Sequence, residues 1–304
     1  MKLNLLWSKG YIQKNEYCLK DTNYISTNND IIEQIKWCEK HTPGYIWIRT
    51  TDSKNKNLET DLDFFAQNLN LLTLPCILIT SDGDRDTPSS YSDFTIKSIL
   101  ASDKIRKWFT QNYDKSIIND KLHFYPIGIN LHHKKEHMNL PYQTIVDSLL
   151  EINKKVGHIT KENTIFCDSH LNFTHPERKE MLKVLKDNKN IRFLSKKVDF
   201  KEIHELYSKY QFVLSPRGNG VDCYRTWEAF LFGAIVITKT SSLDRMYIDN
   251  NLPVVILQDW DELNSLNLNN KLDRWKREHL EKTSSENVLP KFNINYWLNI
   301  NSDI

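Results

Sequence analysis

Residues 212–237 read FVLSPRGNGVDCYRTWEAFLFGAIVI, and this stretch decides the expected fold. The apolar run 212–214 predicts a short strand. The strand ends at Ser215-Pro216, because proline cannot donate a ladder hydrogen bond and biases the residue before it towards an extended conformation. A second apolar run, 234–237, predicts a buried strand that follows a helix. Strand, loop, helix and strand in this order indicate part of a parallel α/β domain.

Between the two strands, a loop with two glycines opens onto a predicted helix over residues 222–232. Asn219 and Asp222 are both suitable N-caps, and Gly233 stands where a helix commonly ends. Glycines lack a Cβ, so they adopt positive φ readily and let backbone amides approach a ligand. The loop therefore predicts amides at a helix N-terminus that are open to an anion.

Charged side chains around this loop suit a nucleotide diphosphate. Arginines bind phosphate with paired N–H donors, and a carboxylate accepts hydrogen bonds from ribose hydroxyls. Chemistry alone leaves an alternative, in which an ordinary surface Arg–Glu pair follows an ordinary loop. The candidate donor contacts in this stretch are Arg217, Gly218, Asn219, Gly220, Arg225 and Glu228.

The run SPRGNGVDCYRTWEAFLFGAIVIT, followed by SSLDRMY, LPVVIL and DWDEL, resembles the C-terminal motif of exostosin-like glycosyltransferases, including relatives from large DNA viruses. The resemblance is dense over residues 205–263 and thin before residue 75. It implies an α/β protein of the GT-B architecture, with two Rossmann-like domains and a cleft between them. It also implies an inverting enzyme that uses a UDP-sugar, with Ser215, Arg217, Arg225 and Glu228 as donor-nucleotide contacts.

The chain of 304 residues is long enough for two domains. We expect an acceptor-side domain over residues 1–135 and a linker over 136–160. The nucleotide-sugar domain is expected over 161–285, and a C-terminal helix over 286–304 is expected to pack back on the first domain. Within the second domain, the loop after the predicted strand 164–167 brings Pro176 to the first turn of a helix. Its neighbour Arg178 is a third cationic candidate, because in GT-B transferases this loop faces the donor phosphates.

Composition limits the possible partners and the compartment. There are 41 basic and 39 acidic residues, and this balance gives no general reason to expect nucleic acid or an anionic membrane. We find no membrane span and no signal peptide, which sets the chain apart from Golgi-anchored exostosins. Five scattered cysteines without metal-ligand spacing suit a reducing cytoplasm, that of the host if the protein is viral.

A second candidate site follows the apolar strand 76–80, where the sequence reads SDGDRDTP. Clustered carboxylates at the end of a strand can serve as a general base, so Asp84 or Asp82 is expected to deprotonate the acceptor hydroxyl. Exostosin-like relatives carry an Asp-x-Asp segment followed by proline, which Asp82, Asp84 and Pro88 match. Two alternatives stay open. One is a solvated turn in which Asp86 caps the next helix, and the other is a GT-A-like metal site formed by Asp82 and Asp84.

Other segments give weaker signals. An amphipathic pattern predicts a helix over residues 94–112. The histidine pair His132 and His133 could touch the donor or acceptor, although a linker role is favoured. His170 and His175 could form a metal pair, but hydrogen-bonded surface histidines are the commoner outcome.

The sequence thus predicts an inverting glycosyltransferase that moves a sugar from a UDP-sugar to a hydroxyl of an oligosaccharide or glycoprotein glycan, without a cofactor and without a required metal. Among UDP-sugars we lean towards UDP-xylose. One alternative is a metal-dependent transferase that uses Asp82 and Asp84. The other is a non-catalytic glycan- or nucleotide-binding protein built on a transferase fold.

Overall fold

The computed structural model describes residues 5–10, 28–41, 44–50, 59–132, 142–156 and 159–299. His133 and parts of the expected linker lie outside these ranges. The chain divides into two compact units. One, the β1–β4 unit, comprises Leu6–Ile127, Gly220–Asp222 and Trp297–Ile304; the other, the β5–β9 unit, comprises Met1–Leu5, Gly128–Asn219 and Cys223–Tyr296.

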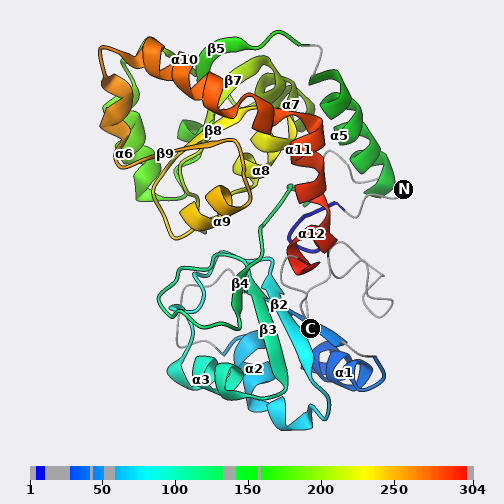
Figure 1. Ribbon diagram of the computed structural model, residues 1–304. Coiled ribbons are helices and arrows are strands. Elements are labelled where there is room, and N and C mark those ends of the chain that lie inside the picture. The colour runs from blue at the N-terminus through cyan, green and yellow to red at the C-terminus, as the bar shows by residue number, and fades with distance from the viewer. Residues whose placement is uncertain are drawn as a thin grey trace. The chain divides into compact units, whose positions relative to one another are not determined.

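The β1–β4 unit is built on a four-stranded parallel sheet in which the strands lie in chain order (Figure 1). Alternate residues of β1, such as Ile46 and Ile48, pack against the same group of helices. The strands are β1 (Gly44–Arg49), β2 (Cys76–Ser81), β3 (Ile105–Thr110) and β4 (Leu122–Phe124); the helices are α1 (Asn28–Cys38), α2 (Asp61–Gln67), η2 (Leu69–Leu71) and α3 (Asp93–Ala101).

The predicted helix over residues 94–112 is wrong in its second half. Helix α3 ends at Ala101, because Ser102 adopts extended φ and ψ, and Ile105–Thr110 forms strand β3 between β2 and β4. Trp108 and Phe109 suit both a helical stripe and a buried strand, and pairing on both edges decides for the strand. The cap of α3 is Ser92, whose side chain accepts from the Thr95 amide, so Asp86 does not cap this helix.

The β5–β9 unit has a five-stranded parallel sheet with the order β6-β5-β7-β8-β9 (Figure 1). The first strand of the unit, β5, therefore lies between β6 and β7, and the strand order reverses on its two sides. This is the 2-1-3-4-5 order of a doubly wound fold. The strands are β5 (Glu162–Cys167), β6 (Ile191–Phe193), β7 (Tyr210–Leu214), β8 (Ile235–Lys239) and β9 (Val254–Leu257).

Helices cover the sheet of the β5–β9 unit on both faces. Residues such as Phe212 and Ile235 point to a core that includes residues of α6, η4 and α10, while α7 and α8 belong to the other side. The helices are α5 (Tyr142–Val156), η3 (Ser169–Leu171), α6 (Pro176–Leu185), α7 (Phe200–Lys209), α8 (Tyr224–Leu231), α9 (Asp244–Asp249), η4 (Trp260–Asn264), α10 (Leu268–His279), η5 (Glu281–Thr283), α11 (Ser285–Val288), η6 (Leu289–Phe292) and α12 (Ile294–Asn299).

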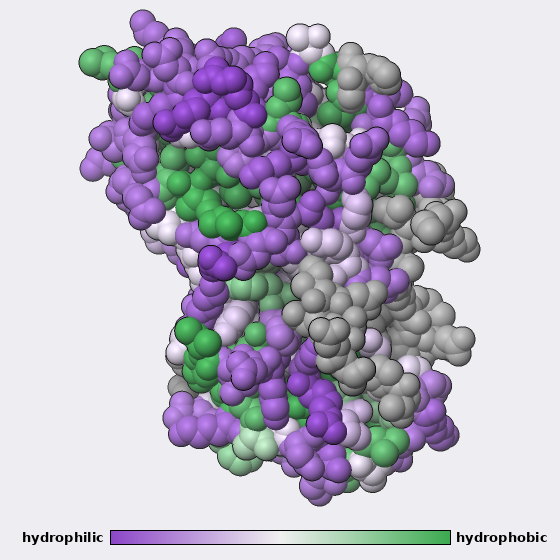
Figure 2. All heavy atoms as spheres, viewed as in Figure 1, coloured by the Kyte–Doolittle hydropathy of each residue, from purple (hydrophilic) through white to green (hydrophobic). Residues whose placement is uncertain are grey.

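These features confirm the α/β class and the two Rossmann-like units that were expected of a GT-B chain. A capping box opens the 3₁₀ helix η4, where Asp259 and Glu262 satisfy each other's backbone amides. Over the described residues, none of the helices is long and apolar enough to cross a membrane. The face shown in Figure 2 is predominantly hydrophilic, with apolar residues gathered over β8 and β9 of Figure 1.

Candidate functional site

The candidate donor site lies at the carboxyl ends of β5 and β7. In open parallel sheets, ligands bind where the strand order reverses, because the loops from neighbouring strands then diverge and leave a crevice. The reversal in this unit falls at β5, between β6 and β7. The loop after β5 leads to α6 and Arg178, and the loop after β7 carries Arg217 and leads to α8. The strand order thus brings together the loops that carry Arg178 and Arg217, which the sequence indicated separately.

Arg178 is the first of the three candidate cations of the donor site. The residue is only 5% exposed, in the first turn of α6, which begins at Pro176 as predicted. Its Nε donates to the carbonyl oxygen of Arg217 at 3.0 Å, and its Nη1 donates to that of Asn172 at 2.8 Å. Within the described part of the chain it makes no ion pair with a carboxylate. Burial, and secondly the nearby Arg225, lower the pKa of Arg178, and Cys223 and Asp168 offset only part of this shift.

The glycine loop packs directly against this arginine. A Cβ on Gly218 would lie 3.0 Å from Arg178 Nη2 and 3.3 Å from Cys223 Sγ, so any side chain here would press on the guanidinium. Asn219 is exposed, and its carbonyl oxygen lies 3.5 Å from Arg217 Nη2. The Arg217 amide donates to Glu177 at 3.2 Å. The backbone of Gly218 therefore lies close to the Arg178 guanidinium.

Arg225 is held differently from the other two arginines. Its Nε donates to Asp168 Oδ1 at 2.5 Å, and its Nη2 lies 3.3 Å from Oδ2. Tyr207 also donates to Asp168, at 3.1 Å. Burial alone would lower the pKa of Arg225, but the attraction of Asp168 reverses this and raises it. Arg225 is thus a cation whose charge is already compensated.

Asp168 is the site residue that sequence reasoning missed. It directly follows β5, at the carboxyl edge of the sheet, in the segment DSHLNFTHPERKEML. That position after a buried strand was the available signal. Its role as the partner of Arg225, 57 residues further along the chain, depends on strand order, which the sequence does not reveal.

Two predicted donor contacts take structural roles in the loop. The Ser215 hydroxyl is buried and pairs with the Thr226 hydroxyl at 2.9 Å. A Cβ on Gly220 would lie 2.7 Å from the side-chain amide of Asn112, so close packing alone accounts for this glycine.

The expected N-caps of the central helix are wrong. Helix α8 begins after Cys223, which makes no side-chain cap hydrogen bond. Asp222 is used elsewhere, because its carboxylate accepts from the Ile127 amide at 2.8 Å. The expected stop is confirmed: Gly233 follows the helix with φ of 69°, in the left-handed region that glycine tolerates.

Glu228, on the buried face of α8, is 7% exposed. Its Oε1 accepts from the Asn130 amide at 3.3 Å and lies 3.9 Å from His204 Nε2. Two residues beyond Asn130, the ring of His132 meets that of Tyr224 edge-on at 6.0 Å. The segment around residues 130–132 therefore lies along the first turns of α8, which the sequence did not indicate.

In the β1–β4 unit, Asp82 is enclosed by cations. It is 7% exposed, at the carboxyl end of β2, with φ of 65°. Its Oδ2 lies 3.1 Å from Arg49 Nε and 3.4 Å from Lys9 Nζ, and its Oδ1 accepts from the Ser8 hydroxyl at 3.1 Å. A carboxylate stabilised by two cations is a weak base, because proton uptake would remove both attractions. The same contacts also disfavour Asp82 as a metal ligand.

The neighbouring Asp84 is half-buried and follows a tightly fixed turn. A Cβ on Gly83 would lie 1.2 Å from the carbonyl oxygen of Thr50, so only glycine fits. The Gly83 carbonyl accepts from Gln111 at 2.9 Å and from Asn112 at 3.0 Å. The backbone that precedes Asp84 is therefore held rigidly. This favours Asp84 over Asp82 for proton transfer.

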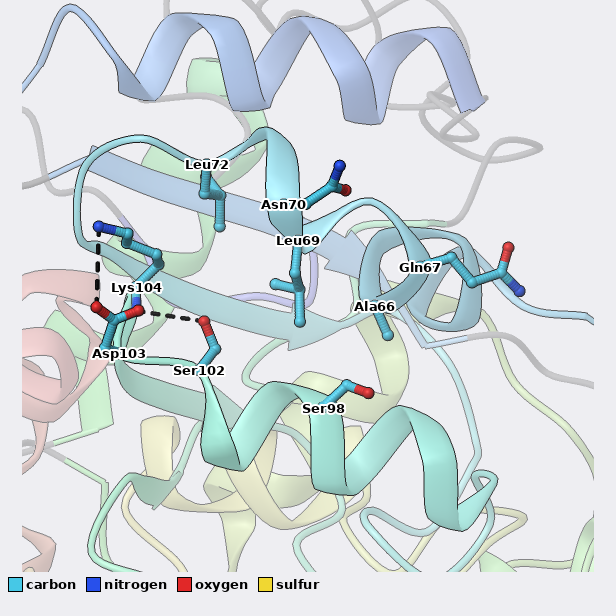
Figure 3. Close-up of a pocket in the computed structure, with 9 residues that line it drawn as sticks. All are labelled: Ala66, Gln67, Leu69, Asn70, Leu72, Ser98, Ser102, Asp103 and Lys104. Atoms are coloured by element: carbon cyan, nitrogen blue, oxygen red, sulfur yellow. Dashed lines mark hydrogen bonds and ion pairs between the residues drawn. The ribbon is translucent and has the colours of Figure 1, made fainter.

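One open hollow of about 540 Å³ lies in the β1–β4 unit, between α2, η2 and the end of α3 (Figure 3). It is lined by Ala66, Gln67, Leu69, Asn70, Leu72, Ser98, Ser102, Asp103 and Lys104. Its residues precede β2 and β3, at the amino edge of the sheet, whereas Asp82 and Asp84 follow β2. Its one cation, Lys104, faces Asp103 at 3.9 Å. This hollow is not where the candidate chemistry lies.

No cluster of three or more histidine, cysteine or acidic residues suited to a metal ion occurs in the ranges that the structure describes. His170 packs edge-on against Phe193, and burial lowers its pKa. His175 is the N-cap of α6, where its Nδ1 accepts from the Glu177 amide. The two histidines thus have separate structural roles.

Neither a protein-family model nor a curated protein matches the chain. Solved structures resemble it at low identity. A glycosyltransferase from Rickettsia africae ESF-5 has 14% identity and a TM-score of 0.43, covering 93% of this chain and 82% of that one. A structure described as trehalose-6-phosphate from E. coli bound with UDP-2-fluoro glucose has 12% identity and a TM-score of 0.46, covering 90% and 76%.

A UDP-GlcNAc 2-epimerase from Methanocaldococcus jannaschii has 14% identity and a TM-score of 0.36, covering 91% of this chain and 84% of that one. Likenesses of this size carry no argument about chemistry, so the fold assignment rests on strand order. The resemblance to exostosin-like glycosyltransferases stays a prediction.

Proposed function

We propose that this protein is a glycosyltransferase that takes its sugar from a UDP-sugar. The observation that carries the proposal is Arg178, a guanidinium that is 5% exposed and has no carboxylate ion pair among the described residues. It lies at the strand-order reversal, with the glycine loop against it. A buried cation without a counter-ion is costly unless an anion binds there, and a diphosphate is an anion that a guanidinium recognises well.

Under this proposal each group has a separate task. Arg178 and Arg217 bind the diphosphate and stabilise the negative charge that grows on it as UDP leaves. Glu228 accepts hydrogen bonds from the ribose. Asp84 takes the proton of the acceptor hydroxyl, whose oxygen attacks the anomeric carbon from the side opposite to UDP and so inverts that centre. UDP departs with the electrons of the broken C–O bond.

Arg225 has an indirect task in this scheme. With Asp168 as its partner, it fixes the start of α8 against the end of β5 and leaves the diphosphate to the other two arginines. The finer parts of the proposal come from the exostosin-like motif alone. They are the inverting outcome, a glycan hydroxyl as the acceptor, and UDP-xylose as the donor to test first.

Ligand-dependent stabilisation tests the proposal directly. We expect UDP to raise the melting temperature, and a ligand at 100 times its Kd adds about 2.7 kcal/mol to the free energy of unfolding. A panel of UDP-sugars, followed by slow donor hydrolysis, then identifies the sugar. Failure of UDP and of every UDP-sugar to shift the melting temperature would refute the proposal. Binding without any turnover would instead support the non-catalytic alternative.

Metal removal separates the two transferase mechanisms. Because arginines rather than a metal ion compensate the diphosphate under this proposal, we expect donor hydrolysis to retain most of its rate in excess EDTA. Complete loss of activity, restored by Mn²⁺ or Mg²⁺, would show that the diphosphate needs a metal ion. It would favour the alternative of a metal-dependent transferase that uses Asp82 and Asp84.

A further inference from the structure

His204 is a buried histidine that the scheme above does not use. It lies on α7, is 1% exposed, and is packed between the ring of Phe200 at 3.9 Å and that of Phe232 at 4.7 Å. Its Nε2 is buried and has no hydrogen-bond partner among the residues that the structure describes. Buried polar groups are rarely left in this state, because the hydrogen bonds lost from water are not replaced.

The polar atom that this nitrogen faces belongs to the candidate ribose ligand. Glu228 Oε1 lies 3.9 Å from His204 Nε2, about 1 Å beyond an ordinary hydrogen bond. That oxygen also accepts from the Asn130 amide, at 3.3 Å. A small rotation of the glutamate side chain would therefore complete a bond to the imidazole without any movement of the backbone.

The backbones of α7 and α8 are held together close to this pair. Lys161 Nζ donates to the carbonyl oxygen of Ser208 at 2.5 Å and to that of Phe232 at 2.9 Å, which joins the C-terminal ends of the two helices. Figure 1 shows α7 and α8 beside each other in the β5–β9 unit. His204 thus faces Glu228 from a fixed position.

We propose that His204 is a positioning residue that orients Glu228 towards the donor ribose, a role that rests on the proposed function. The imidazole N–H at Nε2 donates to Oε1 when the ribose hydroxyls engage the carboxylate. One carboxylate oxygen is then held by the protein, and the other is directed to the sugar of the nucleotide.

The test compares UDP with 2′,3′-dideoxy-UDP, which lacks the hydroxyls that Glu228 would accept. Wild-type protein should bind UDP about ten- to a hundredfold more tightly than the dideoxy analogue, measured by calorimetry. In His204→Leu this preference should fall to about threefold or less. His204→Gln should keep it, because its side-chain amide can donate from a similar place. Ser208→Ala, a buried change on the same helix, should leave the preference at the wild-type value.

Each outcome is decisive. Wild-type protein that binds neither nucleotide refutes the proposed function, and this inference with it. If wild type binds UDP but does not discriminate, or if His204→Leu discriminates as well as wild type, the proposed function stands and the role of His204 is wrong. If His204→Leu binds both nucleotides more weakly by the same factor, then His204 has only a structural role. If His204→Leu does not fold, His204→Asn replaces it, because its amide is too short to reach Glu228.

Discussion

The carboxyl edges of the two parallel sheets carry opposite arrangements of charge. In the β5–β9 unit, the edge has a buried cation, Arg178, for which the described residues provide no carboxylate ion pair. In the β1–β4 unit, the edge has a buried anion, Asp82, which two cations already compensate. Strand order differs as well: it reverses at β5, whereas β1 to β4 follow the order of the chain.

This difference shows which buried charges point to a ligand. Asp82 is bound by Arg49, Lys9 and Ser8, so its carboxylate serves the structure of its own unit. Arg178 binds only backbone carbonyls through its Nε and Nη1, which satisfies N–H groups but supplies no opposite charge. An edge with uncompensated charge is suited to bind a charged substrate, and an edge with compensated charge is suited to hold a rigid scaffold for a neighbouring group such as Asp84.

The largest expected effect is the loss of turnover when Asp84 is replaced. Asp84→Asn keeps the size and polarity of the side chain but removes the basic oxygen, so we expect the transfer rate to fall by about a hundred- to ten-thousandfold. UDP affinity, measured by calorimetry, should stay close to wild type. Asp103→Asn, an exposed acid at the other edge of the same sheet, is the control and should be neutral. A fully active Asp84→Asn protein would remove Asp84 from the chemistry.

The matching change at Asp82 should act on stability instead. Asp82→Asn leaves Lys9 and Arg49 without their shared carboxylate, and loss of one partner of a buried ion pair costs about 3 kcal/mol or more. Urea denaturation should show this loss in the free energy of unfolding. If Asp82→Asn is stable but inactive, then the comparison is wrong and Asp82 is the base.

The two arginines beside β5 provide the next test. Arg178→Met should weaken UDP binding by about ten- to a hundredfold, since it removes a charged hydrogen bond to phosphate. Arg225→Met should chiefly lower stability, because it leaves the half-buried Asp168 without its cation. Exposed Arg192, in the same unit, is a suitable control when changed to Met. Loss of UDP affinity in Arg225→Met at unchanged stability would reverse the two roles.

Much of the fold followed from the sequence because its signals are local. Apolar runs bounded by proline, glycine and capping residues predicted β2, β7, β8 and α6, and Gly233 ends α8 as expected. The error at residues 105–110 is also physical. One amphipathic pattern fits two structures, and pairing with β2 and β4, which the sequence does not display, selects the strand.

The candidate site was predictable in its residue types but not in its partnerships. Arg178, Arg217 and Glu228 were nominated from loop chemistry and a family resemblance. That Arg225 is neutralised by Asp168, and that Ser215 pairs with Thr226, follows only from which strands are neighbours. Charge compensation is a property of three-dimensional pairing, so a sequence shows which cations exist but not which of them remain available to a ligand.

Replacement of Lys161 is expected to have the smallest effect. It is also the strictest check on the argument that a buried cation without a carboxylate partner marks the donor site. Like Arg178, it is a cation bound by backbone carbonyls, but it lies at the amino end of β5, where it joins the ends of α7 and α8. Because these carbonyls are at helix C-terminal ends, which attract a cation, its role is structural. Burial lowers the pKa of Lys161 to about 7.

The unfolded chain, with a lysine pKa near 10.5, therefore binds a proton that the folded protein lacks between about pH 7 and 10.5. The contribution of Lys161 to the free energy of unfolding, taken as the difference between wild type and a Lys161 variant, should rise with pH across this window, by at most about 1.4 kcal/mol per pH unit. Lys161→Met should flatten that rise, whereas the exposed Lys155→Met should not. Neither variant should change UDP affinity. If the slope is reversed, the carbonyls outweigh burial and keep the ammonium charged. If Lys161→Met weakens UDP binding as strongly as Arg178→Met, then a buried cation without a carboxylate does not by itself mark the donor site.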